Sequence, residues 1–166
     1  KRMSTLNQSL LMLSKIENQQ FKDKEEVVFN DVVKTMISDF SSILEFKSIE
    51  LDLIENGEFK TIINKDLAYS LLSNLFKNAI KHNTNNGKII IELDNHSLKI
   101  KNNSNRKTPL NSRDIFNRFY KESGDQLSTG LGLSIVKTIV DHHSNINIYY
   151  DFEDPFHIFS LKNKNS

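Results

Sequence analysis

The sequence contains no cysteine and only five glycines in 166 residues. The absence of cysteine excludes disulfides, thiolate metal sites and cysteine nucleophiles, and it is typical of a reducing compartment, so we expect a cytoplasmic protein. Long hydrophobic runs are also absent: stretches such as "KIIIEL" and "SLLSNLF" are far shorter than the ~20 residues that span a bilayer. We therefore expect no direct membrane contact by this chain.

The sequence also lacks an excess of either charge. It has 22 Lys and Arg against 21 Asp and Glu, which gives a formal net charge of +1. No global basic field exists to attract a polyanion such as DNA, so we expect no nucleic-acid partner. The length is sufficient for one main hydrophobic core with a short appendage.

The first 20 residues show the spacing of a bundle helix. Apolar residues recur at intervals of three, four and three, as at the a and d positions of a heptad: Met3, Leu6, Leu10 and Leu13. Leu11 and Ile16 widen this stripe beyond a simple two-stranded seam. We expect the partner helices outside this chain or in a second copy. The chain starts "KRMS" without an initiator methionine, and we interpret it as part of a longer protein.

The pattern after residue 24 predicts an α+β fold. Strands are expected at 25–30, 48–55, 88–93, 97–102, 145–152 and 156–161. Helices are expected at 31–47, at 64–82 with its start at Asn64 or Asp66, and at 128–143. Asn30 or Asp31 is predicted to cap the first of these helices, and "DNHS" to form a hairpin turn. Residues 103–129 are predicted to be a loop with a short helical piece around "SRDIFNRFY". We expect a two-layer α/β sandwich with the helices on one face of the sheet.

The predicted helix at 64–82 carries three polar residues along one side. Asn74, Asn78 and Lys81 have spacings i, i+4 and i+7. A carboxamide oxygen is a suitable ligand for Mg²⁺, and a lysine one turn later can neutralise a phosphate. On these residues alone, an ordinary solvated face of a helix in an Asn-rich protein remains an alternative.

The stretch "STGLGLSIVK" places Gly130 and Gly132 directly before an apolar helical pattern. Glycines let the backbone approach a ligand, and the first amides of a helix attract anions, so the stretch suits a polyphosphate. Ser128 and Thr129 can cap the helix or donate from their hydroxyls. The alternative is a loop that ends in a core helix. Because neither G-x-x-x-x-G-K-[ST] nor G-x-G-x-x-G occurs, those two nucleotide folds are not supported.

The long loop contains "DIFNRFYKES", in which cationic and aromatic residues alternate. Arg118 and Lys121 lie among Phe116, Phe119 and Tyr120, as in a lid whose aromatic residues anchor cationic phosphate clamps. The alternative is an apolar staple that pins a surface loop.

Together, "LLSNLFKNAIKHN", "IFNRFYKES" and "STGLGLSIVK" resemble the N, F and G2 boxes of sensor histidine kinases, members of the GHKL ATPase superfamily shared with gyrase and the heat-shock chaperone. The resemblance covers nearly the whole chain. It implies the C-terminal part of the second dimerisation and phosphoacceptor helix at 1–20, a linker at 21–27 and a catalytic ATP-binding domain of the GHKL fold at 28–166.

The resemblance also implies an activity. ATP and Mg²⁺ are the implied ligands, and the γ-phosphate passes to a histidine and then to an aspartate of a response regulator. The implied location is the cytoplasmic portion of a membrane-bound sensor. None of the five histidines lies in an H-E-x-x-x-P-like context on a bundle helix, so we expect the phosphoacceptor outside this chain. The implied partner is the phosphoacceptor bundle of the same or the sister subunit. His142 and His143 are explained by their place at a helix C-terminus.

Residue by residue, the resemblance implies that Asn78 is the Mg²⁺ ligand and Asn74 its helper, with Lys81 on phosphate and His82 against the nucleotide. Asn78, Lys81 and Arg118 are the implied catalytic residues, and Arg118 and Lys121 belong to the lid. The turn that faces the phosphates comprises Ser128, Thr129, Gly130, Leu131, Gly132 and Leu133.

One box departs from the family pattern. The family usually has D-x-G-x-G after the strand at 97–102, where this chain has "NNSNRK", with Asn102 in place of Asp and Ser104 in place of the first Gly. Asn keeps an acceptor for the adenine amino group, but its own amide must be satisfied elsewhere. A neutral bond in place of a charge-assisted one costs about 1 kcal/mol, so we expect weaker ATP binding.

Two alternatives remain at this point. An ATP-hydrolysing clamp or a serine-directed kinase is disfavoured, because the N-box helix has no carboxylate from Ser73 to Asn78. A nucleotide-sensing or dimerisation module with a degenerate ATP site is favoured by Asn102 and by the missing glycines of its box.

Overall fold

The structure is a computed structural model that describes residues 2–121 and 129–164. Its helices are α1 (Arg2–Glu17), α2 (Phe29–Asp39), α3 (Ser41–Phe46), α4 (Lys65–Lys81) and α5 (Gly132–Asp141). Its strands are β1 (Glu25–Val28), β2 (Glu50–Glu55), β3 (Lys60–Ile63), β4 (Lys88–Leu93), β5 (Ser97–Asn103), β6 (Ile146–Glu153) and β7 (Phe156–Asn163).

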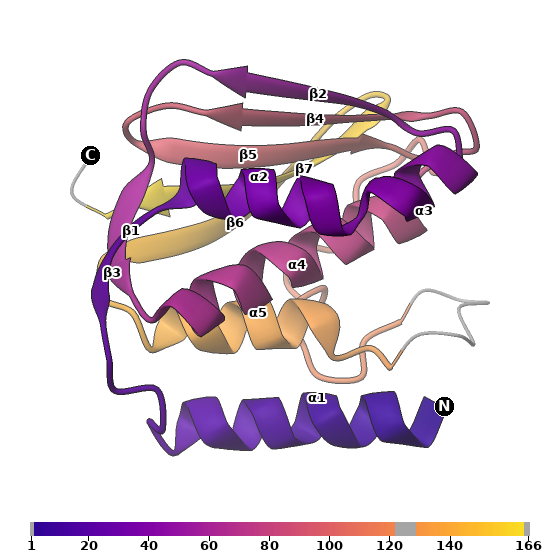
Figure 1. The fold of residues 1–166 in the computed structure, drawn as a ribbon. Helices are drawn as coiled ribbons and strands as arrows, with labels where there is room; N and C mark the ends of the chain where they lie inside the picture. Colours follow the sequence, from indigo (N-terminus) through magenta and orange to yellow (C-terminus); the bar gives the residue numbers. More distant parts are fainter. Residues whose placement is uncertain (1, 122–128, 165–166) are drawn as a thin grey trace.

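Five strands form the main sheet, in the order β2-β4-β5-β7-β6, and β1 and β3 form a separate antiparallel pair. The β2–β4 pair is parallel and the other pairs of the main sheet are antiparallel. Helices α2, α4 and α5 cover one face of this sheet (Figure 1). The predicted α+β two-layer sandwich is therefore confirmed, as is the hairpin between β4 and β5, in which Leu93 pairs with Leu98.

The core lies between these two layers. Strand β4 alternates half-buried and buried residues, so that Ile89, Ile91 and Leu93 point inward. Helix α4 supplies the opposite wall with Leu71 and Leu75, which are almost completely buried. This packing fixes α4 against the sheet, and with it the polar side of α4 at the edge of the core.

Helix α1 forms a further layer, on the side of α5 that faces away from the sheet (Figure 1). Leu13 and Ile16 are buried in this contact, whereas Met3 and Leu11 are 78% and 57% exposed. The sequence placed Met3 and Leu13 on one seam with all partners outside the chain. The structure differs because α5, within the same chain, covers one face of the helix.

Local hydrogen bonds explain where the predicted elements were wrong. The helix expected at 31–47 is divided at Phe40 into α2 and α3, and α2 begins at Phe29 without a side-chain cap. Asn30 instead donates to Glu55 Oε1 (2.7 Å) and accepts from the Phe59 amide (3.1 Å). This buried amide thus secures the turn between β2 and the unpredicted strand β3.

Two further expectations can be compared with the structure. The predicted start of α4 at Asn64 is confirmed, because Asn64 Oδ1 accepts from the Asp66 and Leu67 amides. The helical piece predicted around residues 112–120 is wrong: this segment consists of successive turns. Within the described parts of the chain, no helix is both long and apolar enough to cross a membrane.

Candidate functional site

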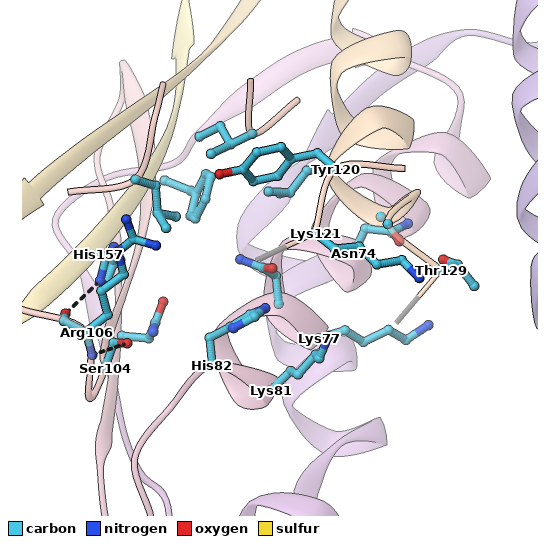
Figure 2. A pocket seen from close by; sticks show the side chains of 18 of the residues that line it. Asn74, Lys77, Lys81, His82, Ser104, Arg106, Tyr120, Lys121, Thr129 and His157 are labelled. Atoms are coloured by element: carbon cyan, nitrogen blue, oxygen red, sulfur yellow. Dashed lines mark hydrogen bonds between the residues drawn. The ribbon is translucent and has the colours of Figure 1, made fainter. Parts of the chain in front are cut away.

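A cavity of about 330 Å³ lies where α4, the start of α5, the loop after β5 and residues 110–121 converge. Its volume is within the range of small-molecule sites. Helix α1 reaches its rim through Thr5 and Ser9, and β7 contributes His157 and Phe159. Figure 2 shows that the lining falls into two groups, with Asn74, Lys121 and Thr129 at one end and Ser104, Arg106 and His157 at the other. We call these ends the α4 end and the β5 end.

The polar side of α4 forms the wall of the α4 end. Asn74, Asn78 and Lys81 all line the cavity, as their spacing predicted. The Asn74 side-chain amide donates to the Ser70 carbonyl (2.8 Å), one turn earlier in the helix. Its other atom, Oδ1, faces Gly132, since a Cβ on that glycine would lie 3.4 Å from it. The carboxamide therefore presents an oxygen to the start of α5.

The cavity is cationic. The described residues that line it include no carboxylate. They include four lysine and arginine side chains: Lys77, Lys81, Arg106 and Lys121. A chain with a net charge of +1 thus gathers positive charge at one concave site. Low-dielectric walls of one sign concentrate the field, so the site favours a polyanionic ligand.

The two glycines at the start of α5 have different roles. Gly130 has φ +70°, and a Cβ there would lie 2.8 Å from the Phe119 backbone, so both conformation and space require glycine. The Phe119 amide donates to the Gly130 carbonyl (2.8 Å), which holds the backbone at Phe119 beside the turn before α5. Gly132 has an ordinary helical conformation, and its missing side chain leaves room beside Asn74.

The start of α5 has no side-chain cap on its N-terminal amides, because Leu131 occupies the N-cap position. Thr129 Oγ1 accepts instead from the Leu131 amide (3.3 Å), one position before the helix. The uncapped amides carry partial positive charge toward the cavity, in the manner of helix N-termini that bind anions. Thr129, Gly130, Gly132 and Leu133 line the cavity.

Asn102 forms part of the β5 end and is 2% exposed. Its side-chain amide donates to the Asn103 carbonyl (2.9 Å), so the donor that Asn adds relative to Asp is satisfied within the protein. The Oδ1 atom keeps its capacity to accept. His82, which ends α4, lies between the two ends of the cavity (Figure 2).

Of the predicted site residues that the structure describes, two do not line the cavity. Arg118 forms an ion pair with Glu17 of α1, and the side chains of both are 46% exposed. Leu131 is completely buried in the core below the turn. Ser128 lies outside the described residues. Lys121, the other cation of the predicted lid, does line the cavity.

Several lining residues were not predicted from the sequence. Lys77 precedes Asn78 and its Nζ lies 5.9 Å from the centre of the Phe40 ring. Its closeness to Asn78 in the chain was the available signal. Arg106 belongs to "NNSNRK", the segment that departs from the family pattern, and its positive charge there was a signal for a polyanion site. His157 lies in a strand pattern, which contains no signal for a binding site.

The histidines at the end of α5 have structural roles. His142 and His143 each place Nδ1 against the carbonyl four residues earlier (2.8 and 2.6 Å). A carbonyl can only accept, so both rings donate to the C-terminal carbonyls of the helix. Burial lowers the pKa of His143, which is 3% exposed, so its neutral form caps the helix without the charge that a dipole interaction needs.

The family model described as histidine kinase-, DNA gyrase B-, and HSP90-like ATPase matches residues 63–162. The heme sensor protein HssS of Staphylococcus saprophyticus is 32% identical over 155 residues, which are 88% of this chain and 33% of that protein. HssS of Staphylococcus aureus strain Newman is 35% identical over 152 residues, or 87% of this chain and 33% of that protein. The chain thus spans about one third of the length of these curated relatives.

Solved structures share the fold. The catalytic domain of the histidine kinase ThkA superposes with a TM-score of 0.75 at 21% identity, covering 86% of this chain and 95% of that one. The Acinetobacter baumannii histidine kinase AdeS gives a TM-score of 0.74 at 24% identity, covering 96% of this chain and 77% of that one. The two-layer architecture therefore occurs in solved structures of histidine kinases.

Proposed function

Because the chain belongs to the histidine kinase-, DNA gyrase B-, and HSP90-like ATPase family, we propose that its cavity binds Mg·ATP, with the triphosphate at the α4 end and adenine at the β5 end. The chain carries the catalytic ATP-binding domain of a sensor histidine kinase. One observation carries the proposed position of the nucleotide. The stretch "STGLGLSIVK" and the polar side of α4, which were both predicted to bind phosphate, lie side by side, because Gly132 at the start of α5 faces Asn74 Oδ1 on α4.

The α4 end suits a magnesium ion that is shared with the nucleotide. The described residues contain no group of three or more His, Cys, Asp or Glu that could hold a metal. Mg²⁺ needs only one or two protein oxygens when phosphate oxygens and waters complete its shell. Asn78 would supply such an oxygen, with Asn74 beside it. When bound, the ion neutralises charge on the phosphates during transfer.

The remaining residues of the α4 end bind and orient the phosphates. Lys81 and Lys121 provide positive charge from opposite walls, and the amides around Gly130 and at the start of α5 donate to phosphate oxygens. Arg118 joins them from the lid when it leaves Glu17. Phosphoryl transfer depends mainly on positioning and charge neutralisation, so these groups account for the share of catalysis that this chain provides.

At the β5 end, Asn102 Oδ1 accepts from the adenine amino group. Its amide is already held by the Asn103 carbonyl, which fixes the orientation of the carboxamide and leaves the acceptor for the base. His82 packs against the nucleotide between the two ends. A neutral acceptor gives a weaker bond than a carboxylate, so the affinity is lower than with Asp but is retained.

For the whole protein, we propose transfer of the γ-phosphate to a histidine on a bundle domain, followed by transfer to a response regulator. Residues 1–20 would form the end of the second bundle helix, 21–27 the linker and 28–166 the catalytic domain. Exposed Met3 and Leu10 suit the remaining bundle helices. A structure of ThkA, with a TM-score of 0.71, contains its response regulator TrrA. This chain would belong to the cytoplasmic portion of a membrane-bound sensor.

A phosphotransfer assay tests this function. The 166-residue chain is mixed with the phosphoacceptor bundle of its own full-length protein and γ-labelled ATP. We expect acid-labile phosphate on the bundle, and none on a bundle whose phosphoacceptor histidine is replaced by glutamine. If nucleotide binds but no transfer occurs under conditions where the intact protein works, the chain is the nucleotide-sensing or dimerisation module instead.

A further inference from the structure

The loop at residues 104–110 forms the outer wall of the β5 end, and it lacks the glycines that the resemblance leads one to expect there. Its first turn is closed by a side chain, because Ser104 Oγ accepts from the Arg106 amide (3.1 Å). The Arg106 guanidinium then bonds to the Thr108 and Pro109 carbonyls (3.2 and 3.3 Å). Side chains thus determine the shape of this loop.

Two residues from β6 and β7 attach the loop to the sheet. The Leu110 amide donates to Tyr150 Oη (2.9 Å), and Tyr150 Oη lies 2.8 Å from His157 Nδ1. The other ring nitrogen, His157 Nε2, lies 3.1 Å from the Arg106 carbonyl. Two points of the loop, Arg106 near its start and Leu110 at its end, are therefore held by one Tyr–His pair. Figure 2 shows the bonds that join Ser104, Arg106 and His157.

The donors and acceptors determine the protonation of the ring. The Arg106 carbonyl can only accept, so His157 Nε2 carries a proton. Tyr150 Oη already accepts from the Leu110 amide and has one proton to donate, which suits an unprotonated Nδ1. A neutral His157 thus satisfies every group in the chain of bonds, and removal of the Tyr150 hydroxyl leaves two of these groups without their partner.

This pair lies next to Asn102, the proposed acceptor for the base. His157 is 4% exposed and is paired with Asn102 across β5 and β7. Its ring stacks on Tyr150, with centroids 6.0 Å apart, and contacts Phe152 at 4.9 Å. Asn102, the proposed acceptor for adenine, and His157, which holds the loop, are therefore neighbours on adjacent strands of the sheet.

We propose that Tyr150 and His157 are positioning residues that hold residues 104–110 as the wall of the adenine pocket and so determine how much the base contributes to binding. The proposal rests on the function proposed above. The pair takes over the task that a glycine-formed turn performs elsewhere: it keeps the loop backbone at a fixed distance from Asn102. The phosphates bind at the other end of the cavity and do not depend on it.

Calorimetric titration of the 166-residue chain with Mg·ATP and with Mg·triphosphate, which has no base, tests this separation. Tyr150→Phe removes the hydroxyl but keeps the ring, and we expect roughly fivefold to tenfold weaker ATP binding with unchanged triphosphate binding. The matched control is Tyr149→Phe. Tyr149 lies on the opposite face of β6, where its hydroxyl accepts from the Asn147 side-chain amide (3.2 Å), so neither ligand should be affected.

A second pair of variants guards against a general loss of structure. His157→Phe removes both polar contacts, whereas His157→Gln restores a donor toward the Arg106 carbonyl and should recover part of the ATP affinity. Equal loss of ATP and triphosphate binding, or unchanged ATP binding in Tyr150→Phe, would overturn the positioning role while the proposed function stands. Failure of the unsubstituted chain to bind ATP would overturn both.

Discussion

The two ends of the cavity are built by different means. At the α4 end, the geometry comes from the backbone and from one helix: Gly130 has a conformation that favours glycine, and Asn74 and Asn78 are one turn apart. At the β5 end, side chains from three strands and a loop hold one another, as in the bond from His157 to the Arg106 carbonyl. The proposed phosphate site thus relies on backbone geometry and one helix, whereas the proposed base pocket relies on contacts between side chains.

The largest effect is expected from Asn78→Ala at the α4 end. Loss of the oxygen that would hold Mg²⁺ removes several kcal/mol of charge stabilisation, so phosphotransfer to the bundle should fall by about 100-fold or more. Asn78→Asp keeps an oxygen ligand and should retain more activity than Asn78→Ala. Equal phosphotransfer rates for Asn78→Ala and the unsubstituted chain would contradict the assignment of the α4 end to Mg²⁺ and the phosphates.

Gly130→Ala should have the next largest effect. A side chain at φ +70° costs about 1–2 kcal/mol and here also meets the Phe119 backbone at 2.8 Å, so ATP affinity and thermal stability should both fall. Gly132→Ala is the matched variant. It lies in a helical position, where Ala is favourable, so its stability should be unchanged or higher and only its ATP affinity reduced. Similar melting temperatures for the two variants would contradict the different roles assigned to these glycines.

Asn102→Asp tests the proposed contact with adenine at the β5 end. A carboxylate strengthens the bond to the adenine amino group, so ATP should bind several-fold more tightly, a gain of about 1 kcal/mol. The same change places a carboxylate oxygen near the Asn103 carbonyl, which accepts the Asn102 amide at 2.9 Å, so the ligand-free chain should melt at a lower temperature. Weaker ATP binding in calorimetry would show that Asn102 does not contact the base.

Glu17→Gln should give the smallest effect. The ion pair with Arg118 is half exposed, and such pairs contribute about 0.2–1 kcal/mol, so release of Arg118 should change nucleotide affinity by less than about fivefold. The expected direction is tighter binding, measured by calorimetry at low and high salt. Weaker binding would indicate that Glu17 holds Arg118 in its binding position.

The same contrast explains what could be predicted from the sequence. Asn74, Asn78 and Lys81 lie within two turns of α4, so helical spacing alone places them on one side. The Tyr150 and His157 contacts with Leu110 and Arg106 span 40 and 51 residues, and both residues fit an ordinary strand pattern. Arg118 was predicted to belong to the lid, whereas in the structure it pairs with Glu17. This contact depends on the packing of α1 against α5, which local patterns do not contain.

The fold followed the same rule. Hairpin β4–β5 and helix α4 were predicted because their signals are local, in the turn "DNHS" and the cap Asn64. Strand β3 was missed, since it pairs with β1, whose partner residues lie more than 30 positions away. The division between α2 and α3 at Phe40 was also missed, because an apolar residue there fits the helical period.

The most direct test of the account is calorimetric titration of the 166-residue chain with ATP, with and without Mg²⁺, beside the same titration of Asn78→Ala. We expect saturable binding of one ATP per chain, strengthened by Mg²⁺ in the unsubstituted chain and not in Asn78→Ala. Absence of binding at millimolar nucleotide, or equal Mg²⁺ dependence in the two proteins, would contradict it.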